Sequence, residues 1–460
     1  MSRYRVWHAI ARLSGHTRTL AAMSAPSVWL TTLGCSKNQV DSDKITSVLG
    51  ESGYVDASSP ESADVVMVNT CGFIEDARRE SVETILDLGE AKRPDAKLVV
   101  VGCMAQRYES ELTAALPEAD AVIGLARYPE LVGELDSMTG WQPISISGVR
   151  RSHMDILEVI NRPTPVTPFA YVKVAEGCNK TCSFCAIPLM RGKQRSRVGV
   201  GILEEIEGLV AGGVQEVVLV AQDLAAYGRD NGAGSIEKLV EDAADIAGLG
   251  RLRLYYLYPR EIRQGLIEVM AGHDTIADYF DLSLQHASKR LLRSMRRPGS
   301  GSSHLDLIDR IRSAAPDAAT RSSFIVGYPG ETERDLNELE DFLVDARLDW
   351  AGFFPFSAEE GTEAATLPDQ IPSDVISERL RHIQRVQDGI TAAANASVVG
   401  STFKVLVDQV EDGQSIGRSY REAPEIDGVI LLDGGGPGSW VRAEVTGVYG
   451  TDLSAKVVAT

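Results

Sequence analysis

Residues 170–185, AYVKVAEGCNKTCSFC, join an apolar strand directly to three closely spaced cysteines, and this stretch decides the fold. Cys178, Cys182 and Cys185, the loop triad, follow one another at spacings of four and three. Three thiolates so arranged can wrap one face of a metal centre. Zinc normally takes a fourth protein ligand, and no nearby Cys or His supplies it. A cubane iron–sulfur cluster bound by three cysteines instead keeps one iron open to another ligand.

The strand before the cysteines is the first of six candidate strands in residues 165–395. Helical segments separate the six, and such units with right-handed crossovers predict an incomplete (βα)6 barrel in place of the full eight. Barrel enzymes carry out their chemistry at the carboxyl ends of the strands, which is where the loop triad falls. The candidate strands are AYVKVAE (170–176), EVVLVAQ (216–222), RLRLYYLY (251–258), FDLSLQH (280–286), SSFIVG (322–327) and WAGFFPF (350–356).

Residues 28–139 alternate apolar strands with helical stretches, which predicts a parallel sheet covered on both faces. The other three cysteines, Cys35, Cys71 and Cys103, each follow one of these strands directly. Because the carboxyl ends of parallel strands share one edge of the sheet, we expect these cysteines to converge there as a second three-thiol site, the edge triad. The alternatives are plain ones: buried cysteines acting as small hydrophobic residues, and, for the loop triad, a zinc knob or a chance cluster.

The remaining segments complete an α/β multidomain chain. Residues 396–460 carry short β runs divided by glycine-rich turns, which predict a small antiparallel β-barrel. Residues 140–164 lose the strand–helix pattern and form a linker. Residues 1–27 contain four Arg and no acid, a composition typical of a transit peptide. A disordered leader, or a start at Met23, explains this segment as well.

The composition is that of a globular chain, with 44% hydrophobic and 24% charged residues. No apolar run approaches the roughly 18 residues of a membrane span, so we expect no membrane segment and a cytoplasmic protein. Acidic residues outnumber basic ones by 65 to 46, which gives a formal charge of -19. Binding to a nucleic-acid backbone needs a basic face, so this excess argues against general nucleic-acid binding and suits a basic protein partner.

The three-block order over residues 28–460 resembles the methylthiotransferase family, and EGCNKTCSFC (176–185) resembles the motif of the radical S-adenosylmethionine (SAM) superfamily. The resemblance implies a flavodoxin-like N-terminal domain, a radical SAM core and a C-terminal TRAM domain. It also implies two [4Fe-4S] clusters. The cluster on the loop triad would bind SAM and cleave it to a 5'-deoxyadenosyl radical, with Phe184 as its shield. The auxiliary cluster on the edge triad would handle sulfur, and a second SAM would donate the methyl group.

Two branches of this family differ in target: one modifies adenosine in transfer RNA, the other an aspartyl residue of small-subunit ribosomal protein twelve. YYLYP (255–259), LQHAS (284–288) and GRSYREAPEIDGVI (417–430) resemble the second, RimO-type branch. Residues 396–460 hold nine acidic and five basic residues, which favours a basic protein substrate over RNA. A transfer-RNA enzyme and a non-catalytic iron–sulfur ribosome-assembly factor are the alternatives. The resemblance makes these residues candidates for substrate binding: Arg418, Ala423, Pro424 and Asp427.

Four further residues lie where strands of the predicted barrel end. Gln222 and Asp223 follow the second strand, at the position where members of the superfamily contact SAM. Gly327 ends the fifth strand, where a glycine allows either close approach of a cofactor or merely a tight turn. His286 also lies at a strand end and fits a structural role equally well. The resemblance further implies an electron donor such as flavodoxin or ferredoxin.

Overall fold

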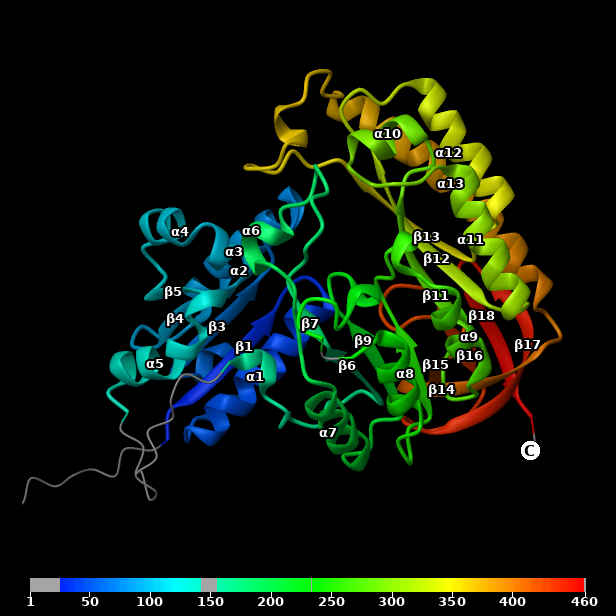
Figure 1. Ribbon diagram of the computed structural model, residues 1–460. Helices are drawn as coiled ribbons and strands as arrows, with labels where there is room; N and C mark the ends of the chain where they lie inside the picture. Colours follow the sequence, from blue (N-terminus) through cyan, green and yellow to red (C-terminus); the bar gives the residue numbers. More distant parts are fainter. Residues whose placement is uncertain (1–24, 142–154, 233, 459–460) are drawn as a thin grey trace, which may run out of the picture.

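The computed structural model describes residues 25–141, 155–232 and 234–458. The expected leader, except for its last three residues, and most of the expected linker lie outside these ranges. Figure 1 shows three parts in chain order: an N-terminal α/β part in blue and cyan, a central part in green and yellow, and a C-terminal β-barrel in red. Among the described residues, no helix is long and apolar enough to cross a membrane.

The N-terminal part is the parallel sheet that the strand–helix alternation predicts. Its described strands lie in the order β2-β1-β3-β4-β5, and every pairing is parallel. Side chains of α1 and α5 pack on one face and side chains of α2, α3 and α4 on the other. β2 was not predicted because it has two exposed residues only. The strands are β1 (Ser27–Thr32), β2 (Val55–Asp56), β3 (Val65–Thr70), β4 (Lys97–Gly102) and β5 (Ala121–Gly124); the helices are α1 (Ser36–Glu51), α2 (Glu75–Ala91), α3 (Cys103–Arg107), α4 (Glu109–Ala115) and α5 (Leu131–Thr139).

The central part is the incomplete barrel, and each of its six predicted strands is present. They form two three-stranded parallel sheets, β10-β9-β6 and β11-β12-β13. Parallel bridges from Leu252 to Ile276 and from Leu257 to Leu282 join the two sheets into one arc. The strands are β6 (Phe169–Lys173), β9 (Glu216–Val220), β10 (Arg251–Leu254), β11 (Tyr279–Gln285), β12 (Ala319–Val326) and β13 (Trp350–Pro355).

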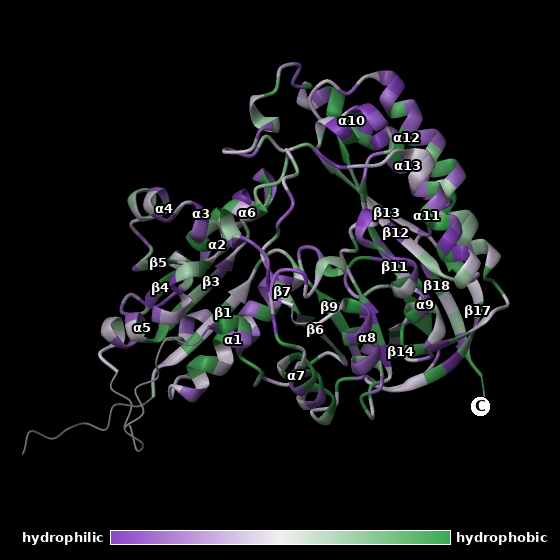
Figure 2. Cartoon of the chain, in the orientation of Figure 1, coloured by the Kyte–Doolittle hydropathy of each residue, from purple (hydrophilic) through white to green (hydrophobic). Residues whose placement is uncertain are grey.

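Helices cover the outer face of this arc. Their buried side chains pack against alternate residues of the strands in one large core, and Figure 2 shows the apolar residues concentrated on the strands. A small hairpin of β7 (Ala175–Glu176) and β8 (Arg195–Ser196) leaves the barrel beside the cysteine loop. The helices are α6 (Ile187–Arg191), α7 (Gly199–Ala211), α8 (Ile236–Ala244), α9 (Gln264–Gly272), α10 (Lys289–Ser294), α11 (Gly301–Ala314), α12 (Glu333–Ala346) and α13 (Ser373–Ser397). Short 3-10 turns span Pro60–Ser62, Leu125–Glu130, Ile156–Glu158, Leu224–Ala226, Pro259–Glu261 and Ala364–Thr366.

The C-terminal part is a closed barrel with the order β14-β15-β16-β18-β17. The prediction of a small β-barrel is confirmed, with one correction: β16 and β18 pair in parallel. A closed ring of five strands cannot alternate direction throughout, so one parallel pairing is unavoidable. The strands are β14 (Thr402–Glu411), β15 (Gln414–Arg418), β16 (Ile430–Leu432), β17 (Trp440–Tyr449) and β18 (Asp452–Val457).

The C-terminal barrel is joined to the central barrel by a buried charge cluster. Glu216, the first residue of β9, accepts hydrogen bonds from Arg253 (2.8 Å) and from Arg418 of β15 (2.9 Å). Arg251 lies 3.5 Å away. Burial alone would raise the pKa of Glu216, but the surrounding guanidinium groups, Arg418 foremost, lower it to about 2. The loop 419–429, which follows β15, thereby covers the amino ends of the barrel strands.

Replacing the Glu216 carboxylate tests this junction. Glu216→Gln leaves buried guanidinium groups unpaired, so we expect a loss of about 3–5 kcal/mol in the free energy of unfolding. Because the pKa is lowered by folding, the contribution is complete above the ordinary value near 4.5 and is lost as the pH falls through about 2. Chemical denaturation between pH 7 and 2 should show the two proteins converging at the acid end.

Glu338→Gln is the matched control, because Glu338 pairs with Arg334 on the exposed face of α12. An exposed pair of this kind contributes about 0.5 kcal/mol or less. Equal losses in the two variants, or a Glu216 effect independent of pH, would contradict the assigned role.

Candidate metal centres at the two cysteine triads

The edge triad assembles at the carboxyl edge of the N-terminal sheet, as the sequence predicts. Cys35 caps the start of α1 after β1, Cys71 directly follows β3, and Cys103 begins α3 after β4. The strands β1, β3 and β4 are neighbours in the sheet. Gly34, at φ +91°, packs so closely that an added Cβ would lie 2.8 Å from the Sγ of Cys71. The turns that carry these thiols are therefore in direct contact.

The environments of the edge thiols differ. Burial raises the pKa of Cys103 to about 12, and burial, with a smaller contribution from Cys35, raises the pKa of Cys71. Burial by the surrounding protein also acts to raise the pKa of Cys35. The positive charges of Lys37 and Arg191 outweigh this effect and lower the pKa. Two of the three thiols are thus poor thiolates by themselves, and a bound metal is the partner that would stabilise their charge.

The loop triad lies just beyond β7, at the carboxyl mouth of the central barrel. The Cys178 amide donates to the Gly192 carbonyl (3.1 Å), which ties the loop to the end of α6. Ser183 donates to the carbonyl of Ser294 (2.8 Å), the last residue of α10. Burial raises the pKa of Cys185 to about 12 and also raises that of Cys178. The loop is held on two sides, and the thiols of Cys178 and Cys185, like the buried edge thiols, favour the protonated form until a metal binds.

The donor sets fit a cluster better than a single ion. In the described ranges, no three His, Cys, Asp or Glu side chains are close enough to hold one metal ion. Zinc normally takes a fourth protein ligand, whereas a cubane bound by three cysteines keeps one iron open to another ligand. Three cysteines per site also leave one position open. The residues present fit two iron–sulfur clusters.

The two triads lie close to each other across the boundary between the N-terminal and central parts. Cys103 is packed in one apolar cluster with Ala186, the residue after Cys185, and with Met190 of α6. Glu359, in the loop after β13, accepts from Arg78 of α2 and Arg107 of α3, each at 2.5 Å. These contacts hold the carboxyl edge of the sheet against the mouth of the barrel.

Side chains at the mouth of the barrel fit a polar cofactor. Both carboxylate oxygens of Asp223 are buried and lack a hydrogen-bond partner, and Lys180 lies 3.4 Å away. The side-chain oxygen of Gln222 is also without a partner, while its amide donates to Glu176 (2.7 Å). Unpaired buried polar atoms are costly, so such groups indicate a ligand. An amino acid head group, as in SAM, offers the donors that these oxygens need.

Phe184, Gly327 and His286 occupy structural positions. Phe184 packs, half buried, against the apolar cluster of α10, which supports the loop triad from behind. An added Cβ on Gly327, at φ +84°, would collide with Ile376 of α13, so this glycine makes room for a helix. The buried His286 ring accepts from the amides of Ala287 and Ser288 (2.9 and 3.0 Å). Of the two interpretations of Gly327, the positive φ fits the tight turn, and contact with a cofactor stays a prediction.

The four C-terminal candidates are placed differently from the expectation of substrate contact. Arg418 and Ala423 are 2% and 1% exposed, and Pro424 is buried between them and the barrel. The Asp427 side chain accepts from Tyr279 of β11 (2.6 Å), and the Pro424 carbonyl accepts from Tyr255, the residue after β10 (3.3 Å). These residues seal the amino end of the barrel. The prediction that they bind substrate is replaced by this role.

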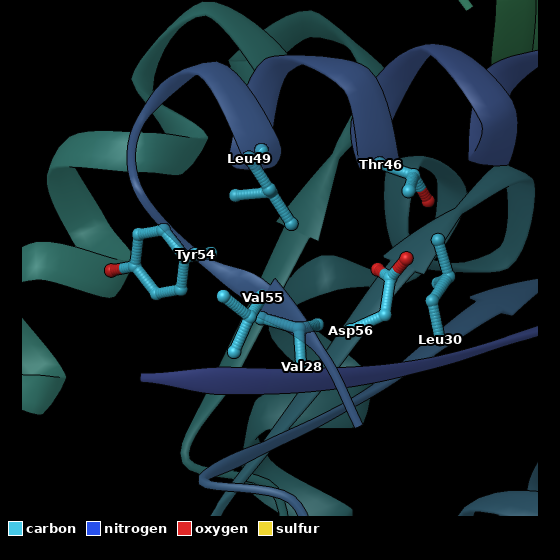
Figure 3. Close-up of a pocket in the computed structure, with 8 residues that line it drawn as sticks. Val28, Leu30, Thr46, Leu49, Tyr54, Val55 and Asp56 are labelled. Carbon is cyan, nitrogen blue, oxygen red and sulfur yellow. The ribbon is translucent and has the colours of Figure 1, made fainter. Parts of the chain in front are cut away.

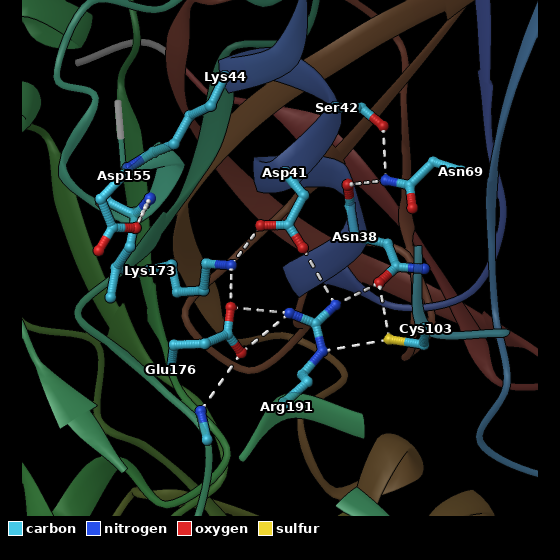
Figure 4. A network of polar contacts seen from close by, with 12 residues as sticks. Asn38, Asp41, Ser42, Lys44, Asn69, Cys103, Asp155, Lys173, Glu176 and Arg191 are labelled. Atoms are coloured by element: carbon cyan, nitrogen blue, oxygen red, sulfur yellow. Dashed lines mark hydrogen bonds and ion pairs between the residues drawn. The ribbon is translucent and has the colours of Figure 1, made fainter. Parts of the chain in front are cut away.

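Sequence reasoning missed the polar residues at the domain boundary. Figure 4 shows Arg191 of α6 between Asn38 and Asp41 of α1 on one side and Glu176 on the other. They belong to segments up to 153 residues apart, and nothing in their spacing marks them as a group. Glu176 alone carried a signal, because it immediately precedes the cysteine loop.

Two cavities are notable in the described residues. The hollow in Figure 3, beside β1 and β2, has a volume of about 20 Å³, which suffices for little more than one water molecule. The other, about 490 Å³, lies at the domain boundary, and Tyr128, Glu176 and Arg191 are among the residues that line it. Its size is that of a ligand pocket.

Comparison with known proteins agrees with this arrangement. The model of the uncharacterized protein family UPF0004 matches residues 27–124, that of the radical SAM superfamily matches 172–343, and that of the TRAM domain matches 399–458. The ribosomal protein uS12 methylthiotransferase RimO of Moorella thermoacetica is 43% identical, over 91% of this chain and 96% of its own. Its namesake from Streptomyces griseus is 40% identical, over 94% of this chain and 97% of its own.

The chain belongs to the RimO methylthiotransferase family. It is a radical SAM enzyme that transfers a methylthio group and uses SAM and [4Fe-4S] clusters. Among solved structures, the radical SAM methyltransferase TsrM of Kitasatospora setae has a similar fold, with a TM-score of 0.53 at 14% identity over 87% of this chain and 82% of that one. The family expected from the sequence is thus confirmed.

The tight contact at Gly34 provides a test of the edge triad. In Gly34→Ala the new methyl group meets the Sγ and Cβ of Cys71, at a backbone conformation that disfavours side chains. We expect a loss of about 2–4 kcal/mol in the free energy of unfolding and a reduced iron content. Denaturation curves and iron analysis measure these effects. Gly50→Ala in α1, where nothing lies within 4 Å, is the control and should leave both unchanged or slightly raise stability.

Proposed function

We propose that this chain methylthiolates the β-carbon of an aspartyl residue of ribosomal protein uS12, the small-subunit ribosomal protein twelve. The observation that carries the proposal is the pair of three-thiol sites packed against each other through Cys103 and Ala186. Replacing hydrogen on an unactivated carbon requires chemistry that side-chain acids and bases cannot supply, because the carbon has no acidic proton. Two adjacent cluster sites meet that need.

The two triads take different roles in this proposal. Cys178, Cys182 and Cys185 hold the cluster that binds SAM, because their loop lies at the barrel mouth. Cys35, Cys71 and Cys103 hold the auxiliary cluster that handles sulfur. When bound, the clusters and SAM supply the electron, the abstraction of a hydrogen atom and the methyl group that the reaction needs.

The protein supplies orientation and exclusion of water. Asp223 and Gln222 would accept hydrogen bonds from the amino acid head group of SAM through side-chain oxygens that have no hydrogen-bond partner in the protein. Glu359 holds the N-terminal sheet over the barrel mouth through Arg78 and Arg107, so the reacting groups stay near one another. The TRAM loop closes the opposite end of the barrel, with Trp350 donating to the Arg421 carbonyl (2.7 Å).

Charge supports a basic protein substrate. Because Arg418, Ala423 and Pro424 are buried, we assign recognition to the exposed surface of the C-terminal barrel. Glu411, Asp412 and Glu444 are exposed there. Ribosomal proteins that bind rRNA are basic, and opposite charge speeds encounter and selects partners. A low-potential donor such as flavodoxin or ferredoxin reduces the clusters, in a cytoplasm that keeps the cysteines reduced. The domain limits that accompany this proposal are 28–139, 165–395 and 396–460, with a leader at 1–27 and a linker at 140–164.

Separate alanine variants of the two triads test their division of roles. Cys182→Ala should abolish reductive cleavage of SAM, because the cluster that binds it loses a ligand. Cys71→Ala should leave part of this cleavage intact but stop insertion of sulfur. Chromatography of deoxyadenosine and mass spectrometry of a substrate peptide measure the two outcomes. Deoxyadenosine release by Cys182→Ala, or full methylthiolation by Cys71→Ala, would count against the assignment.

Mass spectrometry of a deletion strain decides the substrate. We expect uS12 from the deletion strain to lack one methylthio group on an aspartyl residue, and the wild-type gene to restore it. Transfer RNA from the same cells is the control and should keep its modifications. Loss of methylthioadenosine with intact uS12 would favour a transfer-RNA enzyme. If neither molecule changes and anaerobic assays release no deoxyadenosine, the chain acts as an assembly factor instead.

A further inference from the structure

Arg191 contacts the edge triad through a buried guanidinium group. Its Nε donates to the Sγ of Cys103 at 3.2 Å. One terminal nitrogen donates to both carboxylate oxygens of Glu176, at 2.9 and 2.8 Å. The other donates to Asn38 (2.6 Å) and Asp41 (3.0 Å), as Figure 4 shows. An arginine has five N–H groups, so its donors are fully used.

The neighbours of Arg191 fix the direction of its Nε–H group. One terminal nitrogen contacts Glu176 and the other contacts Asn38 and Asp41, so contacts on both sides set the plane of the guanidinium. Lys173 bonds to both Asp41 and Glu176, so neither carboxylate is free to follow a rotating arginine. Turning Arg191 away from Cys103 would leave these buried carboxylates short of partners, at a cost of several kcal/mol. The surrounding ion pairs therefore hold the Nε–H group of Arg191 against the sulfur of Cys103.

A hydrogen bond to a ligand sulfur changes the electronic properties of a cluster. It stabilises negative charge on the sulfur, and the reduced cluster is the more negative form, so the bond favours reduction. Cys103 is 5% exposed, so water is in a poor position to replace the arginine. The loop triad has a counterpart, because Arg297 lies 3.7 Å from the Sγ of Cys182. Each triad thus has a guanidinium group of its own.

We propose that Arg191 is a positioning residue of the auxiliary site, and that its N–H···S bond to Cys103 raises the reduction potential of the cluster held there. The inference rests on the proposed assignment of the edge triad to that cluster. It adds a residue from the radical SAM core to the control of a cluster in the N-terminal domain. The same guanidinium reaches Gln222 at the SAM site through Glu176, so one group links both sites.

The test isolates the auxiliary cluster in the full-length chain. The Cys178/Cys182/Cys185→Ala background retains only the edge triad. In it, Arg191→Gln should move the midpoint potential to a more negative value in an EPR-monitored titration. Pulsed EPR in D2O should also lose the coupling of one exchangeable proton. Arg191→Lys keeps the charge without the Nε–H group, so we expect the same loss of coupling with a smaller shift in potential.

The reciprocal background, Cys35/Cys71/Cys103→Ala, retains only the loop triad and serves as the control. There Arg191→Gln should leave the potential unchanged, while Arg297→Gln should make it more negative. An unchanged potential and proton coupling of the auxiliary cluster in Arg191→Gln, or equal shifts of both clusters, overturns the proposal. Loss of the auxiliary cluster from both Arg191 variants also overturns it, since the role is then structural. If the edge triad binds no cluster even with Arg191 present, the proposed function itself fails.

Discussion

The structure depends on pairing buried charges where its parts meet. At the boundary between the N-terminal sheet and the barrel, Arg191 and Lys173 lie among Asp41 and Glu176, all shielded from bulk water. Burial alone would raise the pKa of Glu176, but Arg191 and Lys173 lower it. A shift of the two parts by a few ångströms would leave these charges unpaired, which costs far more than a lost apolar contact. The arrangement of the two cysteine triads follows from this constraint.

The same principle fixes the third domain. Glu216 receives guanidinium groups from its neighbouring strand and from the TRAM barrel, so the TRAM domain has one favourable orientation beneath the central barrel. Its loop reaches Tyr279, the first residue of β11, and Trp350, the first residue of β13. The catalytic end of the barrel thus faces the N-terminal sheet, and the other end is sealed.

The sequence was most informative where chemistry and backbone pattern coincide. The site of the loop triad was predictable from the spacing of its cysteines alone. The site of the edge triad was predictable because each of its cysteines follows an apolar strand of a parallel sheet. The sequence pattern did not predict the features that depend on which strands pair. Strand β2 has two exposed residues, and the parallel β16–β18 pairing follows from closure of the ring and not from any local propensity. The helices, the strands and the barrels were predictable because the period of the hydrophobic residues along the sequence indicates each of them.

The C-terminal residues that were predicted to bind substrate, but are paired inside the protein, were assigned that role for a different reason. Arg418 and Asp427 are charged, and charged residues in a signature suggest contact with a partner. Here the partner lies within the chain: Arg418 pairs with Glu216, and Asp427 with Arg321 of β12. Arg191 was not predicted as a site residue, because an isolated arginine at the end of a short helix belongs to no recognisable sequence motif. Its partners also lie within the chain. Pairing across domains is a tertiary property that composition and spacing do not encode.

Burial also sharpens the meaning of the acidic composition. Among the described residues, eleven Lys and Arg side chains are buried but only nine Asp and Glu. The interior therefore holds a slight positive excess, and the surface is more acidic than the formal charge of -19 suggests. Buried ion pairs take up basic residues that a protein surface would need in order to bind a nucleic-acid backbone. An acidic surface attracts a basic protein, which is the kind of substrate proposed for this chain.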